Sequence, residues 1–586
     1  MKNLILVIIV VFQFSCKNLK EIGKTTLEKV SEKEEQSNSE FYNVYIEQQT
    51  LFNQEILNSW NANPPAFMIK NTNGWRELGP NSTDNTVTWS ATNATNFFPG
   101  QLTFVAFSPV FASQLVLTGS EYSGLWYSED KGENWKYGGT DQLGPIIGVS
   151  HAVVDPTNES TWYIATGNSI DEWGTTNGIY KTIDKGLHWT PLFINSDFAG
   201  GGTFQIKKMM IKPDNSEHMY VCTKKGLFLI SDLHSTPQLQ LVNTPGSNQS
   251  YYDIEFKIDN PNIIYASGSG DANNPAPLVW SIDGGLSWGN MPVTVSNLTN
   301  SSVTLGAYRI AMEVPMYDAT NSDYVNKMYA IVIKDPDLET GTIITPDAQL
   351  GNIDLNFHDP NSGCDDRLTA KLYRFNFNQS NVNNSQWIDK GWLFRGTFYI
   401  NTSTNDPCGN FAENFDPLGC YESGGIDISR AQSFGISPTD ANILFFGDVR
   451  MAQCTTGLND NFGAYASING TGQNDGNIHD DIHSIKPFPD GSGIIQVGDG
   501  GASTTTSITS GTGFARKNKG LNIADVLRFS ISQTKKDIYA LGLMHDYSAV
   551  ARDNKWYALG YGDGQTPMVN YDDANRVYVS WQGRCV

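Results

Sequence analysis

From about residue 75 onward, short apolar segments alternate with segments rich in Gly, Asn, Asp and Pro. Apolar runs of this length, bounded by turn residues, predict β-strands. The same order of strands and turns begins near residues 107, 153, 211 and 258. These copies lie about 50 residues apart, which is the length of a four-stranded propeller blade. A solenoid also repeats, usually with a shorter period. We therefore predict an all-β chain folded as a β-propeller.

A turn motif, Ser/Thr-x-Asp-x-Gly-x-x-Trp, stands at the same place in three copies, and we call these segments the turn boxes. The hydroxyl and carboxylate can bond the backbone of a tight turn, the Gly allows a strained backbone angle, and the Trp buries a large ring. The boxes contain Ser128, Asp130, Gly132 and Trp135; Thr182, Asp184, Gly186 and Trp189; and Ser281, Asp283, Gly285 and Trp288. We interpret these residues as structural. Asp232 marks a copy that lacks the Gly and the Trp.

The second half of the chain is less regular. Residues 335–430 hold three cysteines and many Asn, Asp and Gly residues, so we predict a blade with a Cys-containing insertion there. The inner-strand pattern restarts near 436, 485 and 531, and a further blade is expected from Trp556. Counting these starts gives about eight to ten blades, or one propeller plus part of a second.

The first 16 residues predict an export signal. Lys2 precedes the apolar run 4–14, which is too short to span a bilayer, and Ser15 precedes Cys16. This segment resembles a bacterial lipoprotein signal, in which Cys16 is lipidated, although Gln13 stands where Leu is usual. An ordinary cleaved signal with a chance cysteine is the alternative.

The remaining organisation follows from composition. Residues 17–74 predict a charged tether with a short helical segment, and residues 75–586 form the propeller. No later segment predicts a membrane span, so we expect membrane contact through the lipid anchor only, at the cell envelope on the outer membrane. A net charge of −22 argues against nucleic acid as a partner. It leaves room for calcium or another divalent metal as a cofactor.

The cysteines after Cys16 are even in number, which in an exported protein suggests disulfides. Cys408 and Cys420 could close a short loop, and Cys364 and Cys454 are the next natural pair. The sequence does not decide the connectivity.

The inner strand of each blade lines the central channel of a propeller, and its first residues lie at the channel mouth, where ligands commonly bind. Aligning the repeats places six polar residues near this position. They are His151, Lys208, Glu255, Arg309, His483 and Arg528. We predict a ligand site from this ring of mixed charge. The alternative is that these side chains are solvated strand ends.

His479, Asp481 and His483 alternate and would share one face of a strand. Two imidazoles and a carboxylate could ligate a metal ion. Three such ligands spread over about 13 Å of strand, however, which is too far for one ion unless the strand bulges. The alternative is that Asp481 orients His483 by a hydrogen bond.

The turn boxes resemble the Asp-box (BNR) repeats of sialidases, sortilin-type receptors and xyloglucanase-type glycoside hydrolases. The chain is most similar to secreted bacterial sortilin-like propellers, in which Trp-x-x-Leu-Gly-Pro opens the blades and His-x-Asp-x-His and Gly-Asp-Gly follow. These motifs stand here at 75–80, 479–483 and 562–564. The resemblance covers nearly all of the chain after Trp75. It implies the fold, and it is weak for activity.

A sialidase carries its first substrate-binding Arg in a Phe/Tyr-Arg-Ile-Pro motif ahead of the first box. The nearest string, Tyr-Arg-Ile-Ala at 308–311, follows three boxes and lacks the Pro, so sialidase activity is not expected. Xyloglucanase-type enzymes use two Asp residues in a cleft between two propellers, and no such pair stands out here.

We therefore predict a lipid-anchored extracytoplasmic propeller that binds a polypeptide or glycan ligand at its channel mouth. The alternative is a glycoside hydrolase or lyase acting on an extracellular polysaccharide, and a structural envelope component is a third reading. Whether the protein is an enzyme stays open. Two carboxylates about 5–10 Å apart in a cleft would favour hydrolysis.

Overall fold

The computed structural model describes residues 87–89 and 100–585 with gaps, of which 335–368 and 395–432 are the longest. The chain divides into two units, Met1–Trp75 and Arg76–Val586, and every described residue belongs to the second. The predicted signal, lipidated Cys16 and tether therefore lie outside the described residues. So do Cys364, Cys408 and Cys420.

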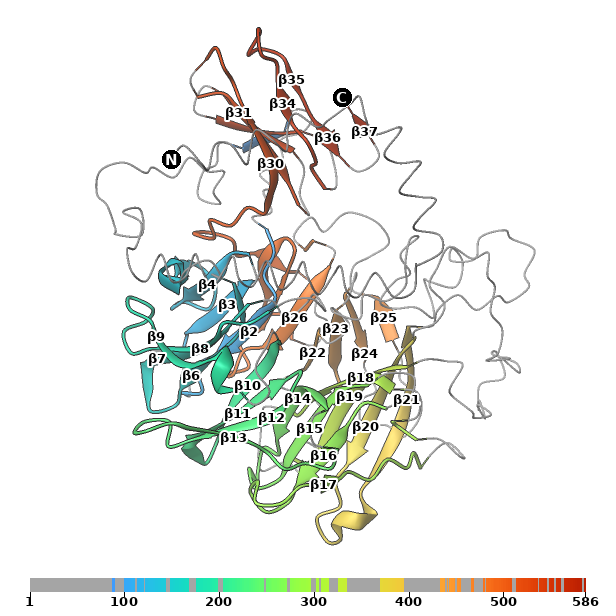
Figure 1. Cartoon of the computed structure of the whole chain (residues 1–586). Helices are drawn as coiled ribbons and strands as arrows, with labels where there is room; N and C mark the ends of the chain where they lie inside the picture. Colours follow the sequence, from blue (N-terminus) through green and yellow to red (C-terminus); the bar gives the residue numbers. More distant parts are fainter. Residues whose placement is uncertain are drawn as a thin grey trace, which may run out of the picture. The chain divides into compact units, whose positions relative to one another are not determined.

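The described residues form an all-β fold with seven four-stranded antiparallel units, blades 1 to 7, which follow one another along the sequence (Figure 1). Five of them are separate sheets, and blades 4 and 5 are joined into one eight-stranded sheet by the pairing of Ser269 with Arg309. The strands of blades 1 to 4 are β2 (Phe104–Phe107), β3 (Val116–Ser120), β4 (Gly124–Ser128), β5 (Lys136–Tyr137); β6 (Val149–Asp155), β7 (Asn158–Thr166), β8 (Gly178–Thr182), β9 (Thr190–Ile194); β10 (Ile206–Lys212), β11 (Asn215–Thr223), β12 (Gly226–Ser231), β13 (Gln238–Leu241); and β14 (Ser250–Phe256), β15 (Ile264–Ser269), β16 (Leu278–Ser281), β17 (Gly289–Asn290).

Blades 5 to 7 continue the pattern. Their strands are β18 (Ala307–Glu313), β19 (Lys327–Lys334), β20 (Thr369–Asn376), β21 (Gln386–Phe394); β22 (Ser433–Ile436), β23 (Leu444–Gly447), β24 (Met451–Cys454), β25 (Tyr465–Ser467); and β26 (Ile482–Pro487), β27 (Ile494–Gly498), β28 (Gly501–Thr505), β29 (Ala515–Arg516). The predicted insertion is thus two separate connections, 335–368 and 395–432, on either side of two ordinary blade strands.

Seven apolar clusters join the seven blades, one between each neighbouring pair, so the blades form a closed ring. The second strand of a blade sends adjacent side chains to opposite neighbours: Trp162 packs with Leu117 of blade 1, and Tyr163 with Phe228 of blade 3. The other pairs are Tyr220 and Phe256, Trp280 and Phe375, Leu372 and Phe446, Phe445 and Ile494, and Ile495 and Trp126. Because both faces of each sheet are covered, the strands read as apolar runs rather than alternating ones.

The ring closes between blade 7 and blade 1 without a shared strand, since every strand of blade 1 precedes every strand of blade 7. Leu102 and Trp135 donate backbone hydrogen bonds to the carbonyls of Gly498 (3.0 Å) and Lys519 (2.9 Å). Figure 1 shows β2 beside β26, and the apolar cluster that contains Trp126 and Ile495 fills this junction. Packing and these few bonds therefore hold the ring shut.

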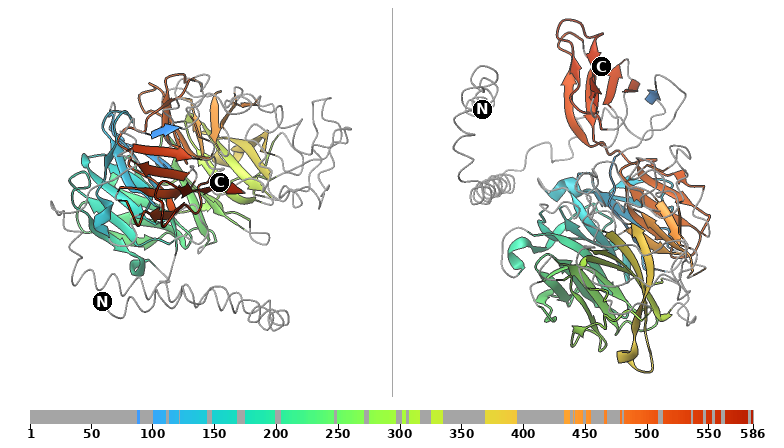
Figure 2. Two further views of the ribbon diagram at one scale, coloured as in Figure 1. Left: turned by 90° about the horizontal axis from the view of Figure 1, so that it is seen from above. Right: turned by 90° about the vertical axis from the view of Figure 1, so that its right-hand side faces the viewer.

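A further sheet lies outside the seven blades. Its strands are β30 (Val526–Ile531), β31 (Tyr539–Leu543), β32 (Ser548–Arg552), β33 (Lys555–Leu559) and, parallel to β33, β1 (Val87–Trp89). Two hairpins follow, β34 (Met568–Val569) with β35 (Val577–Tyr578) and β36 (Ser580–Trp581) with β37 (Arg584–Cys585) (Figure 2).

This sheet corrects the predicted blade count. The strand start near 531 belongs to β30, and Trp556 lies on β33 of the same sheet rather than at the start of another blade. The ring therefore has seven blades instead of eight to ten, and of the two predicted arrangements the one with a single propeller and a further part is nearer to the structure. A sequence repeat alone cannot tell a blade of the ring from a sheet of similar order beside it.

Each turn box connects the third strand of a blade to the fourth, and the expected hydrogen bonds are present. In the first box the Gly132 N–H donates to the Ser128 hydroxyl (2.8 Å), and the Asn134 N–H donates to the Asp130 carboxylate (2.8 Å). Gly132 has a φ of 93°. The other two boxes repeat this arrangement.

The box indoles reach the preceding blade. The Trp135 Nε1–H donates to the Lys517 carbonyl next to blade 7 (2.5 Å), and the Trp189 Nε1–H donates to Gly138 of blade 1 (2.8 Å). Trp288 packs edge-on against Tyr220 of blade 3, with ring centroids 6.1 Å apart. A turn box thus fastens its own blade to the one before it.

Two further observations concern the described residues outside the turn boxes. Cys222 is a buried free thiol, and burial raises its pKa. None of the helices in the described part is long and apolar enough to cross a membrane.

Trp135 serves both a turn box and the ring closure, so Trp135→Ala should lower the free energy of unfolding by about 3–5 kcal/mol. Leu286→Ala is the matched control, because Leu286 lies in the third box and is 89% exposed. Denaturant unfolding of both variants measures the difference. A loss of less than about 1 kcal/mol for Trp135→Ala would contradict a closure held by packing.

Candidate functional site

A β-bulge lies near the start of the inner strand in five blades. The pairing register shifts by one residue at Ser150, Lys207, Tyr252, Tyr308 and His483. A bulge leaves one residue without a ladder partner and re-aims the side chains around it. The bulges therefore mark the end of the channel at which the inner strands begin, which we call the mouth.

Beyond the bulges, charged side chains of five inner strands gather in what we call the channel cluster. The Lys208 Nζ donates to Asp253 (2.6 Å) and to Glu255 (2.5 Å) of the next blade. Lys486 of blade 7 forms an ion pair with Glu313 of blade 5 and so spans blade 6. The cluster consists of His151, Lys208, Asp253, Glu255, Glu313 and Lys486. It contains three carboxylates, two ammonium groups and one imidazole.

The charges of the channel cluster act on one another strongly. Burial lowers the pKa of His151 to about 3, and Lys208 and Lys486 lower it further, so the imidazole is neutral. The Met209 N–H donates to its Nδ1 (3.4 Å), which fits a neutral ring. Burial raises the pKa of Glu255 to about 7 against the opposing effect of Lys208. Burial alone would lower the pKa of Lys208, but Asp253 and Glu255 outweigh it and raise that pKa.

A second group of residues, the mouth cluster, surrounds the ring of Tyr252. The Arg309 guanidinium carbon lies 4.0 Å from the ring centroid and the Lys207 Nζ lies 4.7 Å from it. All three residues are only 7% exposed. Burial lowers the pKa of Lys207 to about 8, and the charges of Arg309 and Lys224 lower it too, while Tyr252 opposes them. Burial is therefore the main cause that disfavours the charged form of Lys207.

No protein-family model matches the sequence, and no curated protein matches it. Solved structures do resemble it. The Niastella koreensis GH74 enzyme is 15% identical with a TM-score of 0.47, and the match covers 83% of this chain and 70% of that one. An ancestral GH74 enzyme is 14% identical with a TM-score of 0.36 over 87% and 68% of the two chains. The Cps50 (Swd1) β-propeller domain of Myceliophteria thermophila is 7% identical with a TM-score of 0.38 over 70% and 97%. At these values the likenesses carry no argument about activity.

Three of the six predicted ligand residues, His151, Lys208 and Glu255, belong to the channel cluster. Arg309 lies in the mouth cluster instead. Glu255 stands two residues beyond the aligned position, since Asp253 is the first paired residue after the bulge of its blade, as His151 and Lys208 are in theirs. The connection that follows the inner strand is longer in blade 4 (257–263) than in blades 2 and 3 (156–157 and 213–214), so the sequence alignment missed Asp253.

His483 and Arg528 lie elsewhere. The His483 Nε2 is 2.7 Å from the Asp499 carboxylate and 3.4 Å from the Gln101 amide nitrogen, at the junction of blades 7 and 1. Arg528 lies on β30, outside the ring, where its guanidinium donates to the Leu527 carbonyl. Its alignment with the inner strands was wrong, since the sheet of β30 repeats their pattern, bulge included.

The predicted metal triplet does not share a strand face. Asp481 precedes β26 and has a φ of 66°, which turns the chain before the strand starts. The carboxylate on His483 comes from Asp499, in the turn between β27 and β28, and not from Asp481. The described residues contain no group of three or more His, Cys, Asp or Glu side chains that could hold a metal ion.

Lys208 compensates two buried carboxylates, so Lys208→Met should lower the free energy of unfolding by about 3–5 kcal/mol. The double variant Lys208→Met/Glu255→Gln should recover part of this loss, because it removes one of the stranded charges. Lys136→Met is the control, since Lys136 pairs with Glu129 at the surface and its loss should cost at most about 1 kcal/mol. Equal losses for Lys208→Met and Lys136→Met in denaturant unfolding would contradict the compensation.

Proposed function

We propose that this protein binds a polypeptide or glycan ligand at the channel mouth, and that an acidic group of the ligand lies on the mouth cluster. The observation that carries the proposal is the arrangement of Lys207 and Arg309 on opposite neighbouring blades around Tyr252 of blade 4. Two cations about one ring stabilise an anion through charge-assisted hydrogen bonds. The chain as a whole carries a charge of −22, so a place where two cations meet stands out as a site for an acidic group.

The connections of blade 5 are a second reason to expect the ligand at the mouth. Residues 335–368 join the end of β19 to the start of β20, and residues 395–432 join the end of β21 to the start of β22. The register pairs Ala307, at the start of an inner strand, with Lys334, and Lys334 with Thr369. All these strand ends therefore lie at the mouth. Long connections at one end of a rigid scaffold commonly carry binding residues.

The protein acts outside the cytoplasm under this proposal, held to the envelope by a lipid on Cys16. The support is the sequence of residues 1–16. Fractionation of membranes from cells that make the wild type or Cys16→Ser tests the anchor.

A glycoside hydrolase is the second candidate, favoured by Asp253 and Glu255. Both carboxylates bond one ammonium, so their bonded oxygens are no more than about 5 Å apart, the spacing of retaining enzymes. The pKa of Glu255, raised to about 7, suits a general acid. Against this role, Lys208 lies between the two carboxylates and forms an ion pair with each of them. We therefore favour binding.

Peptide and glycan arrays with the purified protein, followed by product analysis, separate the two candidates. We expect an acidic ligand to be bound without cleavage, and Lys207→Met or Arg309→Met to weaken binding by about tenfold or more. Lys181→Met is the matched control, because Lys181 also lies over a tyrosine ring, that of Tyr163 in blade 2. Cleavage products that vanish in Glu255→Gln would replace the binding proposal with hydrolysis. Unchanged affinity in both mouth variants would refute the proposed site.

A further inference from the structure

Blade 3 lacks a turn box, and a histidine stands in the corresponding connection. Between β12 and β13 the chain reads Ser231, Asp232, Leu233 and His234, with neither the box Gly nor the Trp. Asp232 has a φ of 54°, close to the 58° and 59° of Lys131 and Lys185 in the first two boxes. The turn therefore keeps a backbone feature of the boxes but has lost the indole that fastens a blade to its predecessor.

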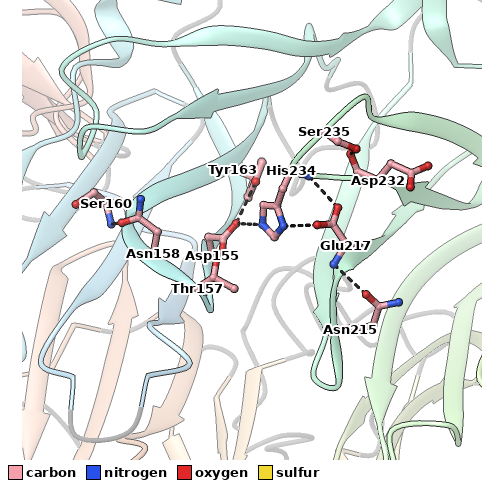
Figure 3. Close-up of polar contacts among 10 residues, drawn as sticks. All are labelled: Asp155, Thr157, Asn158, Ser160, Tyr163, Asn215, Glu217, Asp232, His234 and Ser235. Carbon is pink, nitrogen blue, oxygen red and sulfur yellow. Dashed lines mark hydrogen bonds and ion pairs between the residues drawn. The ribbon is translucent and has the colours of Figure 1, made fainter.

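His234 makes that contact to the preceding blade in another way (Figure 3). Its Nε2 lies 2.6 Å from an oxygen of Asp155, which ends β6 of blade 2. Its Nδ1 lies 2.8 Å from Glu217 of blade 3, and its backbone N–H donates to the same carboxylate (3.0 Å). Only the doubly protonated imidazolium can donate from both ring nitrogens.

Asp155 is built into blade 2. It is 1% exposed, and one oxygen accepts from the Thr157 N–H (2.8 Å) and the Thr157 hydroxyl (2.6 Å). The other oxygen accepts from the Tyr163 hydroxyl (3.2 Å) and faces His234. A carboxylate this buried needs a compensating charge. In the described residues, that charge comes from blade 3.

The surrounding charges favour the imidazolium. Burial alone would lower the pKa of His234, but the hydrogen bonds to Asp155 and Glu217 outweigh it and raise that pKa. Burial alone would raise the pKa of Asp155, but its bonds to Thr157 and His234 outweigh it and lower that pKa. The backbone and ring bonds of His234 lower the pKa of Glu217. Asp232 lies nearby on the same turn, and Lys181 lies over the Tyr163 ring, 5.3 Å from its centroid.

We propose that His234 is a proton-operated clamp between blades 2 and 3, closed while the imidazole is protonated and open once it loses its proton. The ionisation of these three groups determines how the stability of the contact changes with pH. The stability that protonated His234 contributes is fully present below the ordinary histidine pKa of 6.5. It is lost as the pH rises through the raised pKa of His234. The stability that the carboxylates of Asp155 and Glu217 contribute is fully present above their ordinary pKa values of 3.8 and 4.5. It is lost as the pH falls through their lowered pKa values. The clamp is therefore fully closed in mildly acidic solution.

Opening has a defined local consequence. A neutral imidazole leaves the buried Asp155 charge with weaker compensation, which loosens the contact between blade 2 and the β12–β13 turn. The indoles of Trp135, Trp189 and Trp288 do not titrate, so the contacts that they make across their interfaces stay. The junction of blades 2 and 3 thus becomes the alkali-sensitive junction among these four.

The test compares wild type, His234→Gln and the matched control His188→Gln. His188 also has a carboxylate partner, Asp184 at 2.6 Å, but both lie in one turn box and the His188 side chain is 83% exposed. Thermal unfolding is followed from about pH 6 to about pH 9. We expect the wild type and His188→Gln to lose stability over this range, and His234→Gln to lose markedly less. An unchanged pH profile in His234→Gln, or an equal change in both variants, would overturn the proposal.

Hydrogen exchange locates the effect and covers the case in which His234→Gln does not fold. Rates corrected for the intrinsic effect of pH should rise with pH in peptides that span 155–163 and 217–234 of the wild type, and not in peptides around Trp135. Glu217→Gln, at an exposed position, removes one of the two carboxylates and should shift this rise to lower pH. A rise shared by all blade junctions, or one that Glu217→Gln leaves in place, would contradict a clamp at His234.

Discussion

The closure of the ring between blade 7 and blade 1 is the contact on which the rest of the molecule depends. Among the described strands none is exchanged there, and apolar packing around Trp126, Trp135 and Ile495 joins the two blades instead. Two ion pairs, Lys131 with Asp490 and Lys517 with Glu133, flank it. An open ring would lose the channel, because the ion pair of Lys486 with Glu313 exists only while blade 7 stays beside its neighbours.

The two ends of the channel carry different structural features. The turn boxes and the His234 contact lie in connections between third and fourth strands, and they fasten neighbouring blades together. The inner strands begin at the opposite end, where the bulges, the mouth cluster and the strand ends Lys334 and Thr369 of blade 5 lie. This separation lets the mouth vary without disturbing the contacts that hold the blades, which is how propellers carry different sites on one scaffold.

Local patterns gave much of this fold from the sequence. The spacing of apolar runs predicted four-stranded blades, and the turn boxes showed the expected hydrogen bonds, since these depend only on residues within one turn. The blade count failed at β30, whose sheet repeats the pattern of an inner strand outside the ring. The residues within one sheet do not indicate which other sheets it packs against in the ring.

The candidate site was harder to predict because its contacts join distant residues. Lys486 and Glu313 are 173 positions apart, and Lys208 and Glu255 are 47 apart. Turn length causes the second difficulty. The connection after the inner strand is longer in blade 4 than in blades 2 and 3, so the position of the turn does not fix which residue, Asp253 or Glu255, is aligned with Lys208. The alignment nevertheless selected His151, Lys208 and Glu255 together. Neighbouring blades cover both faces of each sheet, so the channel is the place left for polar side chains of the inner strands.

Zero-length carbodiimide cross-linking of the purified protein, read by mass spectrometry, tests the closed ring most directly. The reagent joins an ammonium to a carboxylate only where the two touch. A closed ring of seven blades predicts Lys517–Glu133 and Lys131–Asp490 cross-links within monomers. If these cross-links are absent, or form only in dimers, blades 1 and 7 do not meet in one chain and the account is contradicted.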